Sequence, residues 1–303
     1  MTSHEVAPRR PAARLLTLAD GRTLAWYEFG DPAGTPCLYV PGTPESGLAG
    51  ACFDTTAREA AVRWISVDKP GYGHSDPVPG RRLSDWPRDA TALVDHLGLD
   101  RFALAGESGG GPHALALALA DPDRVTVLAL LASAGVPVAE GIPVTMTSLN
   151  TALFRCARID RRLVRLPFAA LAVLVNHEQA APRLLGLLAR GVPDVDLRVM
   201  GEPEYAPRLA AGADAFRQGS RPAADEFLVI RDPWDLPLAQ LAVPVHAWHG
   251  GQDAHVPLAM AEALWRELPR VETHVHDDAG HTVGFQHRDA VMAVIAAASP
   301  RPA

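Results

Sequence analysis

The sequence predicts an α/β fold, in which a mostly parallel sheet is flanked by helices and a helical cap is inserted between two core strands. Apolar, strand-like runs alternate with helical segments through most of the chain, which is typical of a parallel sheet covered on both faces. Two short alternating runs around Asp20-Gly21 predict an antiparallel hairpin at one edge. Residues 137–231 contain no clear strand, and this stretch is too long to be a loop.

The first part of the chain supplies the hairpin and most of the strands. The hairpin covers residues 15–31, and compact β-rich runs that end in glycine follow at 36–42 and 63–71. The elements after them are a helix over 84–98, an unbroken apolar strand over 101–108, an apolar helix over 110–120 and a buried strand over 124–133. This order places the first part of the core at residues 1–136.

The alternation resumes after the strand-free stretch. Strands are predicted over 243–251 and 271–278, with a helix over 257–268 between them and a last helix at roughly 286–298. We therefore expect a helical cap over 137–231, and a second part of the core over 232–303.

Composition excludes several classes of protein. The 303 residues carry a net charge of −7, which argues against a nucleic-acid binder because such a protein needs a basic face. Lys69 is the only lysine among 28 basic residues, and the arginine-rich run at 155–165 is interpreted as a solvated helix surface. The three cysteines do not form an even set that could pair in disulfide bonds. The N-terminus lacks the long apolar segment of a signal peptide, and the apolar run at 125–139 is too short for a membrane span. We expect a soluble cytoplasmic protein with a small-molecule substrate.

Residues 106–110 read Gly-Glu-Ser-Gly-Gly, which matches the pattern G-x-S-x-G. In this pattern a strand turns sharply into a helix, so that the central serine is strained and its Oγ is exposed above the sheet. The predicted strand before Ser108 and the predicted helix after it supply that context. Ser108 is therefore the candidate nucleophile, and the N–H of Gly109, at a helix N-terminus, is a candidate oxyanion donor.

A serine nucleophile needs a base and an acid that orients the base. In this architecture they follow the serine in the order acid, then histidine, at the carboxyl ends of later strands. Asp253 and His281 stand at those positions. The alternatives also lie near the C-terminus. They are His249, His255, His274, His276 and His287 for the base, and Asp277 and Asp278 for the acid.

These motifs together resemble the α/β-hydrolase superfamily over most of the chain outside the cap. Besides residues 106–110, which form the nucleophile elbow of that family, the similarity rests on "DKPGYGHSDP" (68–77), "PWDLPLAQLAVPVHAWHGGQDAHVP" (233–257) and "AGH" (279–281). The resemblance implies the α/β-hydrolase fold, with Ser108 as nucleophile, Asp253 as acid and His281 as base. Haloalkane dehalogenases and epoxide hydrolases of this fold need an aspartate at the elbow, so Ser108 implies acyl transfer instead.

One segment departs from the family pattern. The loop after the third strand often reads His-Gly-x-Pro, whereas here Pro41 takes the place of the histidine. Because the oxyanion donor is a backbone N–H, we expect that Thr43 can still provide the second one. Because that histidine usually buttresses the loop, its replacement puts the rigidity of the loop in question.

The leading interpretation is a serine hydrolase of a small hydrophobic ester, thioester or amide. The alternatives are a C–C hydrolase, a peroxidase-like enzyme or a non-hydrolytic cyclase or lyase on the same fold, and a ligand-binding protein on a hydrolase scaffold. The candidate pocket residues of the cap are Met146, Leu149, Phe154 and Phe216, and Arg217 and Arg221 are candidates for holding a single carboxylate. The strand-end loops contain no cluster with metal-ligand spacing, so we expect neither metal nor cofactor.

Overall fold

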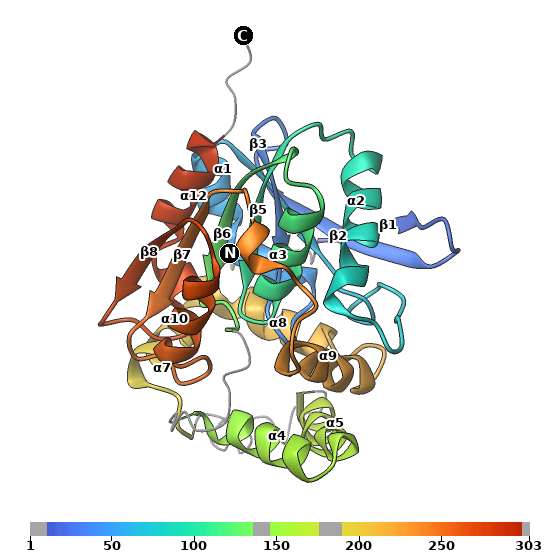
Figure 1. Ribbon diagram of the computed structural model, residues 1–303, viewed down its shortest axis with the longest axis vertical. Helices are drawn as coiled ribbons and strands as arrows, with labels where there is room; N and C mark the ends of the chain where they lie inside the picture. The colour runs from blue at the N-terminus through green and yellow to red at the C-terminus, as the bar shows by residue number, and fades with distance from the viewer. Residues whose placement is uncertain (1–10, 136–145, 176–189, 299–303) are drawn as a thin grey trace, which may run out of the picture.

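An eight-stranded sheet forms the centre of the computed structural model, which describes residues 11–135, 146–175 and 190–298 (Figure 1). The strand order is β1-β2-β4-β3-β5-β6-β7-β8. β1, β2 and β4 pair antiparallel, and every other neighbouring pair is parallel. The strands are β1 (Arg14–Thr17), β2 (Thr23–Gly30), β3 (Thr35–Val40), β4 (Val62–Val67), β5 (Phe102–Glu107), β6 (Val125–Leu131), β7 (Val245–Gly250) and β8 (Val271–His276).

Helices cover both faces of this sheet and bury its apolar residues in two clusters. On one face pack α2 (Trp86–His96), α3 (Gly110–Ala120) and α10 (Leu258–Glu267). On the other face pack α1 (Asp54–Glu59), α12 (Arg288–Ala297) and a 3₁₀ helix at Gly47–Phe53. α11 (Val283–Gln286) precedes α12. The strand β5 is buried throughout and β3 is buried from Cys37 onward, as expected for parallel strands covered on both sides.

A helical insertion between β6 and β7 confirms the predicted cap. Its described helices are α4 (Ser148–Ile159), α5 (Arg165–Val175), α7 (Asp194–Met200), α8 (Ala206–Asp214) and α9 (Arg221–Arg231). α4 and α5 lie at one end of the molecule, with α7, α8 and α9 between them and the sheet (Figure 1). A separate apolar cluster, which includes Leu153, Phe168 and Phe216, holds part of the insertion together. The predicted boundary at residue 137 falls outside the described residues, so it stays a prediction.

The predicted strands are present, but several end earlier than the apolar runs that predicted them. The run at 63–71, for example, gives a strand only to Val67. Its remaining residues form a loop at the carboxyl edge of the sheet, which is where functional groups collect in this architecture. No helix in the described part of the chain is long and apolar enough to cross a bilayer.

Candidate active site

Ser108 stands in the tight turn between β5 and α3. Its φ of 48° lies in the left-handed region, which is uncommon for a residue with a side chain. Glycines make the turn possible, because a Cβ at Gly106 would lie 2.7 Å from the Ala114 Cβ, and one at Gly110 would lie 2.0 Å from the Val40 carbonyl oxygen. The strand, strained serine and helix therefore match the local structure that the sequence predicts.

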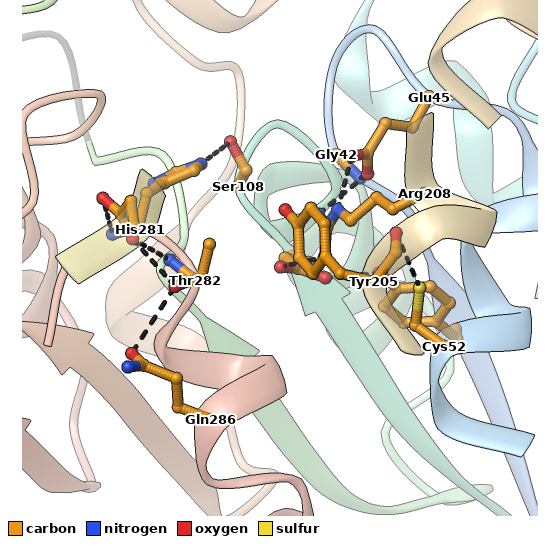
Figure 2. A network of polar contacts seen from close by, with 12 residues as sticks. Gly42, Glu45, Cys52, Ser108, Tyr205, Arg208, His281, Thr282 and Gln286 are labelled. Atoms are coloured by element: carbon orange, nitrogen blue, oxygen red, sulfur yellow. Dashed lines mark hydrogen bonds and ion pairs between the residues drawn. The ribbon is translucent and has the colours of Figure 1, made fainter. Parts of the chain in front are cut away.

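Asp253 and His281 lie in the loops after β7 and β8, and these loops are packed backbone to backbone. A Cβ at Gly250 would lie 2.2 Å from the Gly280 carbonyl oxygen. The His281 Nε2 is 3.0 Å from the Ser108 Oγ (Figure 2), and its Nδ1 is 2.7 Å from the Asp253 Oδ2. The structure thus brings the three side chains together from three separate parts of the sequence.

The charge of Asp253 controls the protonation of this arrangement. Burial disfavours a charged His281, but the Asp253 carboxylate outweighs that effect, and the pKa of His281 is raised, with further contributions from Asp196 and Glu107. Burial likewise opposes the ionised form of Asp253, but interaction with His281 keeps the pKa of Asp253 below its usual range. The Asp253 Oδ1 also accepts hydrogen bonds from the backbone N–H groups of His255 and Val256, at 2.8 and 2.9 Å. Asp253 is therefore a buried, fixed anion behind the imidazole.

The alternative histidines take other places. His249 is buried and bonds through its Nε2 to the Val256 carbonyl oxygen, 2.8 Å away. The His255 ring lies 4.8 Å from the His281 ring, and burial lowers the pKa of His255 to about 4. His274 and His276 lie in β8, and the His287 ring stacks on His276 just before α12. None of these five has an interaction with the Ser108 hydroxyl among those recorded for the described residues.

The alternative acids, Asp277 and Asp278, are both exposed. The carbonyl oxygen of Asp277 accepts a hydrogen bond from the side chain of Gln252, in the loop that carries Asp253, at 3.0 Å. Only Asp253, among the three candidate acids, contacts the His281 ring.

Thr43 and Gly109 are close neighbours above the elbow. A Cβ at Gly109 would lie 2.2 Å from the Thr43 Oγ1, and one at Gly42 would lie 3.3 Å from the Ser108 Cβ. Within the described ranges, the backbone N–H groups of Thr43 and Gly109 donate no recorded hydrogen bond. Two backbone donors beside Ser108 are thus left available for an oxygen atom of a ligand.

Arg208 of α8 is a component of the site that the sequence analysis missed. It is buried between two carboxylates. Its Nε is 2.5 Å from the Glu45 Oε1 (Figure 2), and its Nη1 is 2.6 Å from the Glu107 Oε1. Glu107 is the residue before Ser108, and it also accepts a short hydrogen bond from the Tyr39 hydroxyl. The Glu45 Oε2 accepts the N–H of Gly42 at 3.2 Å. Arg208 therefore links the cap to the elbow and to the loop after β3.

Asp196 of α7 is a second such component. Its buried carboxylate accepts hydrogen bonds from the N–H of His281 at 3.0 Å, and from the N–H and the hydroxyl of Thr282 at 2.9 and 2.8 Å. A Cβ at Gly280 would lie 2.2 Å from the Asp196 Oδ2, which explains the glycine before His281. No motif surrounds Asp196 or Arg208 in the sequence, so only their burial identifies them.

Three of the four candidate pocket residues pack within the cap. Phe216 is buried in the apolar cluster of the cap, Leu149 packs against that cluster, and the Phe154 ring lies 5.3 Å from Phe227. Met146 is half-buried just before α4. Their role in lining a substrate pocket stays a prediction. Arg217 and Arg221 are exposed and pair with Asp214 and Asp225, so neither is a free carboxylate ligand.

Three potential metal ligands, His246, Glu272 and His274, lie together on β7 and β8. The His246 Nδ1 and the His274 Nε2 are 3.2 Å apart, while the ring centroids are 5.6 Å apart and the ring planes differ by 7°. The difference between these two distances is about two ring radii. Both nitrogens therefore lie close to the line that joins the ring centres, and they point at each other. A bound Zn²⁺ needs both lone pairs to converge on a point about 2.0–2.1 Å from each nitrogen. As placed, the pair forms a hydrogen bond instead.

Comparisons with known proteins give the family and the fold of the chain. The model of the alpha/beta hydrolase fold family matches residues 36–288. The chain is 31% identical over 273 residues to the dihydrolipoyllysine-residue acetyltransferase component of an acetoin cleaving system from Pseudomonas putida, with 89% of this chain and 65% of that relative covered. It is 28% identical to a 2-hydroxymuconate semialdehyde hydrolase from Pseudomonas putida, covering 90% of this chain and 89% of the relative. An esterase structure from Exiguobacterium antarcticum superposes with a TM-score of 0.64 at 18% identity, covering 94% of this chain and 98% of that one.

Proposed function

Since the chain belongs to the α/β-hydrolase family, we propose that it is a serine hydrolase that cleaves a small hydrophobic ester, thioester or amide through an acyl-enzyme on Ser108. The observation that carries this proposal is the continuous hydrogen-bonded chain from Ser108 through His281 to Asp253, with separations of 3.0 and 2.7 Å. A hydroxyl next to a base, which is itself oriented by a buried carboxylate, is the arrangement that activates a serine nucleophile.

In the first half of the reaction, the neutral His281 accepts the Ser108 proton at Nε2 while the Oγ attacks the substrate carbonyl carbon. The oxygen of the resulting tetrahedral intermediate accepts hydrogen bonds from the N–H groups of Thr43 and Gly109. His281 then gives the proton to the leaving group, and the ester bond to Ser108 remains. In the second half, water loses a proton to His281 and attacks the acyl-enzyme, which releases the acid and restores the Ser108 hydroxyl. Asp253 stays ionised throughout and stabilises the imidazolium.

A C–C hydrolase is the second candidate, because a 2-hydroxymuconate semialdehyde hydrolase is among the relatives that match over most of the chain. Further relatives are named as hydrolases of dioates, which are dicarboxylates. The charges of this chain favour an uncharged substrate. Arg208 is already paired with two glutamates, and Lys69 and Arg81 both face Glu226. Binding a dianion beside these groups would require one of these buried pairs to break.

A fluorophosphonate probe tests the proposal most directly. We expect one adduct on the wild-type protein, mapped to Ser108, and none on Ser108→Ala. A panel of aryl esters of increasing acyl length should show a rate that rises and then falls as the pocket fills. Failure of Ser108 to react would contradict the serine hydrolase assignment. The second candidate would be favoured if the probe labelled Ser108 and the enzyme turned over 2-hydroxymuconate semialdehyde but no ester in the panel.

A further inference from the structure

The only lysine of the chain is fully buried at the active site. Lys69 follows β4, and its Nζ lies 3.2 Å from the Glu226 Oε1 of α9, with neither side chain exposed. Burial lowers the pKa of Lys69, and the Glu226 charge opposes that effect. An ammonium group is strongly hydrated in water, so a lysine in such a place must have its hydrogen bonds supplied by the protein.

The loop after β3 supplies those hydrogen bonds. The Lys69 Nζ donates to the carbonyl oxygens of Pro41 and Gly42, at 2.6 and 2.7 Å, and lies 3.4 Å from the Thr43 Oγ1. The lysine therefore holds two consecutive peptide groups of the loop that carries Thr43. On the other side of the loop, the Glu45 carboxylate accepts the N–H of Gly42 at 3.2 Å.

Holding the Gly42 carbonyl fixes the direction of the next N–H. The peptide bond between Gly42 and Thr43 is trans, and in a planar trans peptide the C=O and N–H bonds point in opposite directions. Because the Gly42 oxygen points at Lys69, the N–H of Thr43 points away from Lys69. If this peptide rotated, the site would present a carbonyl oxygen where it now presents a donor.

We propose that Lys69 is a positioning residue of the oxyanion hole: by binding the Pro41 and Gly42 carbonyl oxygens it aims the Thr43 N–H, with Glu226 of the cap as its counter-ion. The inference rests on the proposed function. It also accounts for Pro41, because a buried ammonium from the loop after β4 supports the loop from which the family's histidine is missing.

The first test separates positioning from simple structural support. Lys69→Met removes the donors, and the double variant Lys69→Met/Glu226→Gln also removes the stranded carboxylate. With an aryl ester that the wild type hydrolyses, we expect kcat to fall about 10- to 100-fold in both, with KM changed less than about threefold. Inhibition by an aryl boronic acid, whose Ser108 adduct is tetrahedral, should weaken by a similar factor. Lys69→Arg, which keeps donors and charge, should recover part of kcat. A double variant that melts earlier but keeps wild-type kcat and boronate affinity would overturn the proposal.

The second test uses the wild-type protein, so it does not depend on a variant that folds. Labelling with ¹⁵N-lysine gives a single Nζ signal, because the chain has one lysine. A negative oxygen at the Thr43 N–H polarises the Gly42–Thr43 peptide and strengthens the hydrogen bond from Lys69 to the Gly42 oxygen. We therefore expect the signal to shift on boronate binding and not with an amide product analogue. An unchanged signal in a protein whose Ser108 has formed the adduct would overturn this inference and leave the proposed function intact, whereas failure of Ser108 to form any adduct would contradict the proposed function.

Discussion

The two sides of Ser108 are built differently. On the sheet side, His281 and Asp253 come from the loops after β8 and β7. His281 contacts the serine directly, and Asp253 is linked to it through the His281 ring. On the cap side, three helices each contribute one buried charged residue that contacts a core loop rather than the serine. These residues are Asp196 of α7, Arg208 of α8 and Glu226 of α9.

This difference indicates a division of labour between core and insertion. The core loops supply the groups that we propose to react, and the insertion supplies charges that hold those loops. Asp196 holds the histidine loop, Arg208 holds Glu45 and Glu107, and Glu226 balances Lys69. The cap is therefore part of the site as well as its cover. The variants below test each side, from the largest expected effect to the smallest.

Removing the charge of Asp253 should have the largest effect. Asp253→Asn leaves His281 without the anion that orients its ring and stabilises its charged form. We expect kcat to fall by about 10³–10⁴-fold with the fold intact. Steady-state kinetics with an aryl ester, together with circular dichroism, would measure this. The exposed Asp277→Asn is the matched control and should stay close to wild type; if it lost as much activity, the acid assignment would be wrong.

Removing Arg208 should reduce stability more than any exposed ion pair could. Arg208→Met strands the Glu45 and Glu107 carboxylates, and breaking a buried pair in this way costs about 3–5 kcal/mol. The control is Arg266→Met on α10, which breaks an exposed pair with Glu262 and should cost about 0–1 kcal/mol. Urea denaturation would compare the two free energies of unfolding. Equal losses would mean that the cap charges do not tie the cap to the core.

Thr43 tests whether backbone donors or side chains stabilise the intermediate. Thr43→Ala keeps the N–H and should retain most activity, whereas Thr43→Pro removes it and should lose about 10²–10³-fold in kcat. The boronate affinities of the two variants should follow the same order. If both lost activity equally, the Thr43 hydroxyl or the packing of the loop would matter more than the N–H.

Removing the charge of Asp196 should have the smallest effect, and it should appear in the pH dependence of activity. The base must be neutral to act, so activity is lost as pH falls through the pKa of His281, which lies above its usual value near 6.5. Asp196 is one of the charges that raise this pKa. Asp196→Asn should therefore move the acid limb of kcat/KM to lower pH by about half a unit. Asp194→Asn, exposed on the same helix, should leave the limb in place. A shift toward higher pH would contradict the assigned sign.

The sequence by itself determined the sheet, the insertion and the candidate triad. These depend on local signals: apolar runs, glycines at turns, and reactive residue types just after strands. The parallel sheet then brings strand ends together, so Ser108, Asp253 and His281 could be predicted to meet although they are far apart in the chain.

The tertiary structure alone decided which charges are buried against which loops. Asp196, Arg208 and Glu226 stand in ordinary helical sequence, and exposed aspartates, arginines and glutamates surround them. Their partners are 85, 163 and 157 residues away for the His281, Glu45 and Lys69 contacts, respectively. The docking of the cap helices fixes these pairings, because a buried charge must find its partner wherever the chain brings one within reach. For the same reason, composition showed that Lys69 is the only lysine, but only packing placed it beneath the Thr43 loop.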